Sequence, residues 1–293
     1  MDRLVFEDRA YILSQNDGSG GRGLISSRVL HSFGVKTKAI TTSGGKNGQL
    51  FEKLLGTAGF PLEVVRIANE IRTNLTITDK QGLTIKLNEV GPELTYQEAA
   101  AVKHAVIRQL HGAEWLMLCG SLPPGVPDDF YCDLIKAARK KGVKTLLDAD
   151  GAALHLGVEA APTVVSPNQQ EAERLLNRAL ITRAHFREAV TRILEMGAES
   201  VLLSLGGRGV VARNANQMLE AIPPHIDVLS PIGAGDALSA AFLWSLTKNN
   251  DFPEAVRWGV AAGTASSMLP GLEFASLEQT TEIYRQVELR LIR

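Results

Sequence analysis

The segment Gly233-Ala-Gly-Asp236 is followed directly by an apolar stretch, residues 237–246, that predicts a buried helix. Two glycines around an alanine let the backbone turn tightly, so that successive N–H groups point to one place. The N-terminus of the helix adds roughly half a positive charge there. We expect the amides of Gly233, Ala234 and Gly235 to form an anion hole that holds a phosphoryl group. Asp236 would be the base that removes a hydroxyl proton, although a first-turn aspartate is also an ordinary helix cap.

Polar residues follow three further apolar runs of the chain. Gly120-Ser121, Asp148 and Asn168 each come just after the carboxyl end of a predicted strand. In open α/β sheets ligands bind at that edge, and three such positions together favour a cleft. Each residue taken alone is also a normal turn residue.

Asn168 and Glu171 form an Asn-x-x-Glu pair at the start of a predicted helix. A capping box, in which Glu171 reaches back to the cap residue, explains this spacing structurally. Support of Mg²⁺, which prefers oxygen ligands, explains it functionally. Both interpretations stay open on the residues alone.

Three other segments could approach a ligand, and each has a plain structural alternative. Ser204-Leu-Gly206-Gly207-Arg208-Gly209 links two strand-like runs, as a hairpin does, and lacks the Gly-Lys-Ser/Thr ending of a P-loop. Gly20-Gly21-Arg22-Gly23 precedes a predicted helix and reads equally well as a turn. Arg72 could clamp an anion or be solvated. Neither a histidine triad nor a Gly-x-Ser-x-Gly elbow occurs, which disfavours an acyl hydrolase.

The elements that must position these residues alternate between strands and helices. Strands are predicted at 115–119, 144–148, 162–165, 201–205 and 210–212. A helix is predicted from the cap residue Asp128 to about Lys141, another contains Ala172, Leu175 and Leu176, and a third covers 237–246. This alternation predicts an α/β fold, with a mainly parallel sheet and helices on both faces.

A small β lid is expected beside this core. Residues 74–78 and 84–88 alternate polar and apolar side chains around the turn 79–82, which predicts a hairpin with one dry and one wet face. Residues 4–13 could add a strand to it. We therefore divide the chain into an α/β core, residues 14–71 and 91–293, and a lid, residues 1–13 and 72–90.

Composition excludes several classes of protein. The 293 residues carry 31 Lys and Arg against 32 Asp and Glu, which argues against a nucleic-acid partner. No apolar run approaches the ~20 residues that span a bilayer, so no membrane partner is expected. Two cysteines without metal-type spacing exclude a disulfide framework and suggest a reducing, cytoplasmic setting.

The combined motifs resemble those of the ribokinase-like (PfkB-type) sugar kinases. Gly233-Ala-Gly-Asp236, Asn168-x-x-Glu171, Gly120-Ser-Leu-Pro123 and Gly20-Gly-Arg-Gly23 are similar to that family, in the same order. Ile71-Arg-Thr-Asn74 and Asn88-Glu-Val-Gly-Pro-Glu93 are similar to its phosphosugar branch, which includes 1-phosphofructokinase and tagatose-6-phosphate kinase.

This resemblance implies a ribokinase-like fold and phosphoryl transfer from ATP, with Mg²⁺, to a hydroxyl of a phosphorylated ketohexose. Fructose-1-phosphate, fructose-6-phosphate and tagatose-6-phosphate are the implied acceptors, and a homodimer through the lid is the implied assembly. The resemblance implies that Asp236 is the general base and that Gly233, Ala234 and Gly235 form the anion hole. It implies that ATP lies along Ser204, Gly206, Gly207, Gly209 and Asn168, and that the metal lies near Asn168 and Glu171. The implied phosphosugar site contains Gly20, Gly21, Arg72 and Asn74.

The departures from the family gather in the sugar-binding half. Members begin with a core strand ending in Asn-Pro-x-x-Asp, and Met1 falls at or just after that point. Other expected residues are replaced by Tyr11, Gly18, Ile25, Lys46 and Pro231, with Ile25 standing for a sugar-binding Asn. The strand could lie upstream of Met1, which we favour, the gap could be filled by dimerisation, or the chain could be a decayed relative. The alternative function is therefore a catalytically impaired relative that binds a phosphosugar or nucleotide.

Overall fold

The computed structural model describes residues 9–81 and 83–292. Its helices are α1 (Arg22–Ser32), α2 (Gly45–Leu55), α3 (Tyr96–Gln109), α4 (Phe130–Lys140), α5 (Gly151–Glu159), α6 (Gln169–Leu175), α7 (Arg183–Glu195), α8 (Ala234–Asn249), α9 (Phe252–Ser267) and α10 (Leu277–Tyr284). Its strands are β1 (Ala39–Ser43), β2 (Leu62–Arg66), β3 (Asn74–Thr78), β4 (Thr84–Asn88), β5 (Trp115–Cys119), β6 (Lys144–Asp148), β7 (Val164–Val165), β8 (Ser200–Ser204), β9 (Val210–Asn214), β10 (Met218–Ile222) and β11 (Glu288–Ile292).

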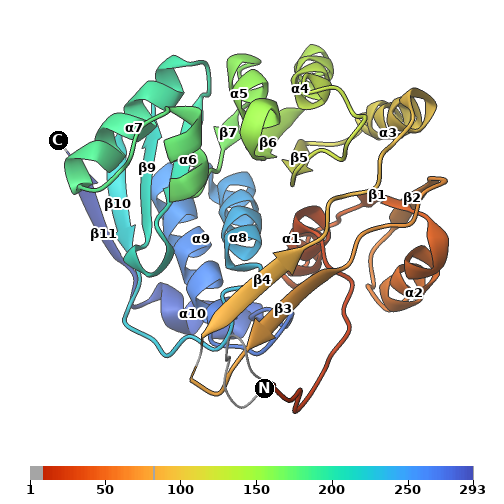
Figure 1. Cartoon of the computed structure of the whole chain (residues 1–293). Coiled ribbons are helices and arrows are strands. Elements are labelled where there is room, and N and C mark those ends of the chain that lie inside the picture. Colours follow the sequence, from red (N-terminus) through yellow and green to blue (C-terminus); the bar gives the residue numbers. More distant parts are fainter. Residues whose placement is uncertain (1–8, 82, 293) are drawn as a thin grey trace.

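Seven of these strands form the main sheet, in the order β11-β10-β9-β8-β7-β6-β5 (Figure 1). Strands β5 to β8 are parallel, as the alternation of strands and helices predicts. Strand β9, expected over 210–212, pairs antiparallel with β8 as in a hairpin, and β10 and β11 are antiparallel additions that the alternation did not predict. The α/β fold is confirmed, with a sheet that is parallel at the β5 half and antiparallel at the β11 half.

Helices cover both faces of this sheet, because the strands are apolar on both sides. Leu147, Val165 and Leu203 pack with α3, α4, α5 and α7 on one face. Their neighbours in the chain, Leu146 and Val164, pack with α8, α9 and α10 on the other (Figure 1). Buried runs of this kind are what a parallel sheet between two helical layers requires. The carboxyl ends of β5 to β8 are thereby fixed at one edge.

The strands β1 and β2 form a separate two-stranded parallel sheet. β5 is the last strand of the main sheet, and no strand of the described chain joins β5 to β1. Helix α1 contacts both β5 and β1 and so bridges the space between the two sheets. The described residues therefore form two separate sheets at this side of the molecule, linked through α1.

The hairpin β3–β4 is confirmed, with Leu75 opposite Leu87 and Ile77 opposite Ile85. It stands apart from both other sheets (Figure 1). The expectation of a third lid strand over residues 4–13 is wrong for residues 9–13, which form no strand, and residues 4–8 lie outside the described chain. A short alternating segment becomes a strand only where a partner edge pairs with it.

The start of α4 differs by one residue from the expected one. Asp129, not Asp128, is the cap residue, and its side chain makes no capping hydrogen bond. The N–H of Phe130 bonds instead to the carbonyl of Pro127, so a turn precedes the helix.

Both cysteines, Cys119 and Cys132, are free thiols. Among the described helices, none combines the length and apolarity that crossing a membrane requires.

Candidate active site

A cleft of about 1930 Å³ collects residues from the lid, from α1, from β5 and from the start of α8. It extends from Lys86 on the lid past Asp236 to Leu118 on β5 and Ile40 on β1. A large cavity lined by apolar walls with a few convergent polar groups is the usual form of a small-molecule site. We therefore build the candidate site around it.

The first turn of α8 supplies the cleft with a carboxylate and with the backbone N–H groups of a helix start. Gly233 caps the helix with φ of 72°, in the left-handed region, so that Ala234 and Gly235 begin the helix behind it. Asp236 stands in this first turn with 7% of its surface exposed. Among the described residues, none donates a hydrogen bond to its carboxylate. A buried carboxylate without donors is available to accept a proton from a substrate hydroxyl.

Replacing Gly233 by Ala is expected to damage both fold and site. A Cβ there would lie 2.5 Å from Cε1 of Phe274 and 3.1 Å from Cγ2 of Ile25, and the left-handed conformation adds roughly 1–2 kcal/mol of strain. We expect lower thermal stability and a loss of turnover of about tenfold or more, because the amides shift. Gly235→Ala is the matched control, since nothing lies within 4 Å of its Cβ position. Equal thermal stability of the two variants would contradict this account.

Arg22 connects two carboxylates that come from distant parts of the chain. Its Nη1 donates to Oδ1 of Asp148 at 2.6 Å, and its Nη2 donates to Oε1 of Glu171 at 2.9 Å. Asp148 ends β6 and Glu171 begins α6, so the edge of the sheet brings the two together. The side chains of Asp148 and Glu171 are 8% and 2% exposed, which makes these ion pairs partly buried.

Burial controls the protonation of the two aspartates. It raises the pKa of Asp236 to about 7, and the negative charge of Asp148 raises it further against the opposing charge of Arg22. Burial also raises the pKa of Asp148 to about 6, while Arg22 acts in the other direction. A pKa near neutrality suits a general base, because the group then both takes and releases a proton at ordinary pH.

The Asn168–Glu171 pair forms the predicted capping box. Oδ1 of Asn168 accepts from the Glu171 N–H at 2.9 Å, and Oε2 of Glu171 accepts from the Asn168 N–H at 2.9 Å. The structural interpretation is therefore confirmed. A role at a metal stays a prediction, and it would have to use Oε1 of Glu171, which Arg22 contacts.

The loop from Ser204 to Gly209 lies beside this pair. Ser204 ends β8 and forms a bridge with Asn168, and a short 3₁₀ turn over Gly206–Arg208 leads into β9. Gly207 has nothing within 4 Å of its Cβ position, so its backbone is open to close approach. Neither this loop nor Asn168 lines the large cleft. The loop continues the edge of the sheet on the side away from the lid.

The candidates expected at the phosphosugar all line the cleft. Gly20 and Gly21 lie before α1, with Gly21 as its cap at φ of 122°. Arg72 lies at the start of the lid, before β3, and its Nη2 is 3.5 Å from Oγ of Ser121, the one weak side-chain contact it makes among the described residues. Asn74 begins β3 and faces the same space.

Ile25 gives this end of the site an apolar side chain. It is 4% exposed, and its Cγ2 lies against Gly233, at the start of α8. An isoleucine offers no hydrogen bond to a sugar hydroxyl. Ile25 instead packs the loop that carries the amides.

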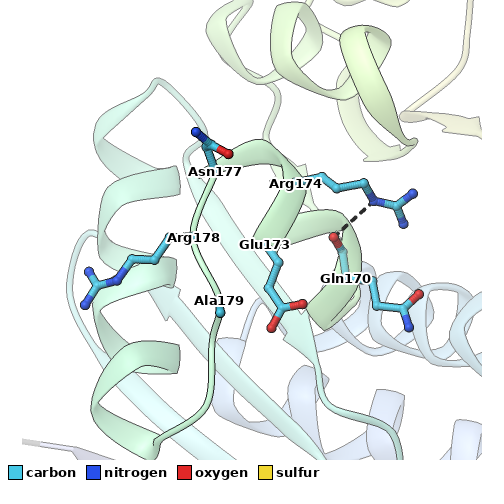
Figure 2. Close-up of a pocket in the computed structure, with 6 residues that line it drawn as sticks. All are labelled: Gln170, Glu173, Arg174, Asn177, Arg178 and Ala179. Atoms are coloured by element: carbon cyan, nitrogen blue, oxygen red, sulfur yellow. Dashed lines mark hydrogen bonds between the residues drawn. The ribbon is translucent and has the colours of Figure 1, made fainter.

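A second hollow lies over the end of α6, lined by Gln170, Glu173, Arg174, Asn177, Arg178 and Ala179 (Figure 2). Its two arginines point away from each other in Figure 2. Each has a partner outside it, Arg174 with Asp150 at 3.2 Å and Arg178 with Glu188 at 2.6 Å. Since its polar groups do not converge, we assign no site to it.

Arg22 is the main residue that sequence reasoning did not select for the site. Its contacts are 126 and 149 residues away in the chain, so local spacing could not reveal them. The available signal was its place between glycines at a helix start, together with the position of Asp148 at a strand end.

Comparison with known proteins shows the family of the chain. The sequence model of the pfkB family carbohydrate kinases matches residues 3–278. The chain is 32% identical to the ATP-dependent 6-phosphofructokinase isozyme 2 of Escherichia coli over 268 residues, covering 90% of this chain and 86% of the relative. It is 26% identical to the 1-phosphofructokinase of Vibrio cholerae over 271 residues, covering 92% and 86%.

Solved structures give the same result. Phosphofructokinase-2 of Escherichia coli in complex with potassium has a TM-score of 0.89 at 29% identity, with 97% of this chain and 93% of that chain covered. A possible 1-phosphofructokinase of Thermotoga maritima has a TM-score of 0.92 at 22% identity, with 100% and 95% covered, which shows the fold. The predicted ribokinase-like fold is confirmed, and the chain belongs to the pfkB family of carbohydrate kinases, which are phosphotransferases.

Proposed function

We propose that this chain transfers the terminal phosphoryl group of ATP to a hydroxyl of a phosphorylated ketohexose. The observation that carries the proposal is Asp236, a buried carboxylate without hydrogen-bond donors, in the first turn of α8 behind a left-handed Gly233. The two relatives that act as phosphofructokinases support the acceptor class. Fructose-1-phosphate, fructose-6-phosphate and tagatose-6-phosphate are the candidate acceptors.

In the proposed reaction Asp236 takes the proton of the acceptor hydroxyl while that oxygen attacks the terminal phosphorus of ATP. The bond to the bridging oxygen breaks, and ADP leaves with the electron pair. The amides of Gly233, Ala234 and Gly235 would hold the oxygens of the transferred group, where negative charge is concentrated. Arg72, Asn74, Gly20 and Gly21 would hold the phosphosugar on the lid side of the cleft.

The remaining candidates would hold the nucleotide and a magnesium ion. Ser204, Gly206, Gly207 and Gly209 would lie along ATP, next to Asn168. No group of three or more His, Cys, Asp or Glu within the described ranges could hold a metal by itself. Oxygens of Glu171 and Asn168 nevertheless fit Mg²⁺, which keeps several waters and binds substrate phosphates. When bound, that ion would neutralise charge on the phosphates.

A screen for ADP release tests the proposal directly. The purified chain is supplied with ATP, Mg²⁺ and, in separate reactions, the three ketohexose phosphates, free sugars and nucleosides. We expect sustained turnover with at least one ketohexose phosphate and little with the others. Turnover confined to a nucleoside would overturn the acceptor class, and nucleotide binding without any turnover would favour the impaired relative. The cytoplasmic location stays a prediction.

We also infer that the lid forms a homodimer contact. Leu75, Ile77, Ile85 and Leu87 share one face of the hairpin, and Leu75 and Leu87 are 48% and 54% exposed. A two-stranded hairpin with an open apolar face is marginal in water and marks an interaction surface. Lys86, on the other face, lines the cleft and its positive charge acts on Asp236, while Leu75 and Ile77 of the apolar face also border the cleft. The Escherichia coli relative is known in a tetrameric inhibited form, which supports assembly in such kinases.

Replacing Leu87 by Asp is therefore expected to convert a dimer into a monomer in sedimentation velocity, because it places a charge in an apolar contact. Ile181→Asp is the matched control, since Ile181 is an exposed apolar residue on the loop between α6 and α7, 73% exposed. The same molecular mass for the Leu87 variant and the unmodified chain would exclude the lid as the contact.

A further inference from the structure

Three buried carboxylates act on the charge of Arg22. Asp148, Glu171 and Asp236 are 6%, 2% and 7% exposed, and they come from β6, α6 and α8. In the described part of the chain, Arg22 is the only side-chain cation in hydrogen-bond contact with any of them. Burial disfavours the charge of Arg22, but Asp148 and Glu171 outweigh this effect and raise the pKa of the guanidinium. Arg22 is therefore permanently charged where it lies.

Each oxygen of Glu171 accepts one hydrogen bond in this arrangement. Oε2 accepts from the Asn168 N–H in the capping box, and Oε1 accepts from Nη2 of Arg22. Oδ1 of Asn168 is likewise used by the Glu171 N–H. The capping box holds α6 at its start, so Oε2 cannot be released without loss of the cap. Oε1 lies outside the capping box, and the charged guanidinium of Arg22 contacts it.

We infer that Arg22 competes with the divalent cation for Glu171 and Asp148, so that the cation binds only when Arg22 releases these carboxylates. The identity of the cation rests on the proposed kinase function. Two positive charges on the same carboxylate oxygen repel each other, and a guanidinium cannot lose its proton to make room. The side chain of Arg22 is 36% exposed and has space in the cleft into which it can turn. Arg22 is thus a positioning residue that keeps the carboxylates ordered until they are needed.

Titration with Mn²⁺ tests this inference on the full chain, with neither nucleotide nor sugar present. The free Mn²⁺ is followed by electron paramagnetic resonance in the unmodified chain and in Arg22→Gln. We expect the variant to bind Mn²⁺ about tenfold more tightly, or better, because one competing charge is gone. Equal or weaker binding by the variant would overturn the inference.

The matched control is Arg187→Gln. Arg187 donates to Oε1 of Glu220 at 3.0 Å, and the two side chains are 42% and 7% exposed, close to the values of Arg22 and Glu171. This variant also leaves a buried glutamate without its arginine, but away from the cleft, so its Mn²⁺ affinity should stay unchanged. Adding Glu171→Gln to Arg22→Gln should remove the gain, and a gain that persists would place the ion elsewhere.

Arg22→Lys keeps the test decisive if Arg22→Gln fails to fold for lack of a counter-charge. A lysine keeps the charge but cannot donate to both carboxylates in the fork geometry of arginine, so its Mn²⁺ affinity should lie between the other two. Weaker Mn²⁺ binding by Arg22→Lys than by the unmodified chain would refute the competition. Since no acceptor is used, a chain inactive in the ADP screen can still show the effect, and an active chain can still fail it.

Discussion

Asp236→Asn is expected to lower kcat by about 10²–10⁴-fold, the range typical for loss of a positioned general base. Asparagine keeps the shape of the side chain but cannot take the proton of the acceptor hydroxyl. Nucleotide binding should change little, because the backbone amides of the α8 start remain in place. Steady-state ADP release with the acceptor found in the screen measures kcat. An equilibrium binding titration measures the affinity for the nucleotide.

Asp129→Asn provides the control for this prediction. Asp129 also stands at the start of a helix, α4, and its side chain makes no capping hydrogen bond. It lies outside the residues that line the cleft, so its turnover should equal that of the unmodified chain. If Asp236→Asn turned over at the rate of Asp129→Asn, the role of Asp236 as base would be lost.

The parts of the site that follow from local chemistry were predictable from the sequence. A helix was expected from residue 237, and the structure begins α8 three residues earlier, at Ala234, behind Gly233, because glycine takes the left-handed cap position without strain. The Asn168–Glu171 spacing closes a capping box through contacts three residues apart. The register of β3 and β4 follows from alternation around a short turn. In each case the deciding interaction joins near neighbours.

The parts that depend on distant contacts were not predictable in this way. The bonds of Arg22 to Asp148 and Glu171 exist only because β6 and α6 end and begin at the same edge of the sheet. The antiparallel strands β10 and β11 pair across about seventy residues, so alternation of strands and helices does not reveal them. Ile25 lies against Gly233 only because α1 packs on the start of α8. The resemblance to a family could indicate the sugar end of the site but not these contacts.

The same buried carboxylate should also make the stability of the chain depend on pH. In the unfolded chain an aspartate has a pKa near 3.8, and in the folded chain burial raises the pKa of Asp236 to about 7. Between these two values the folded state holds a proton that the unfolded state has released. The free energy of unfolding therefore falls as pH rises from about 4 to about 7, by up to about 4 kcal/mol if this group acted alone.

Asp236→Asn is expected to remove this part of the pH dependence, because an asparagine has no charge to bury. At pH 8 the variant should unfold at a higher urea concentration than the unmodified chain, and the difference should shrink toward pH 4, where the aspartate is protonated in both states. Asp129→Asn should follow the unmodified chain at every pH. If the urea midpoints of Asp236→Asn and of the unmodified chain changed in parallel with pH, the burial of Asp236 would not destabilise its charged form. A base that costs stability in its charged form is held there by the fold around it, and its retention then reflects the reaction rather than the stability of the protein.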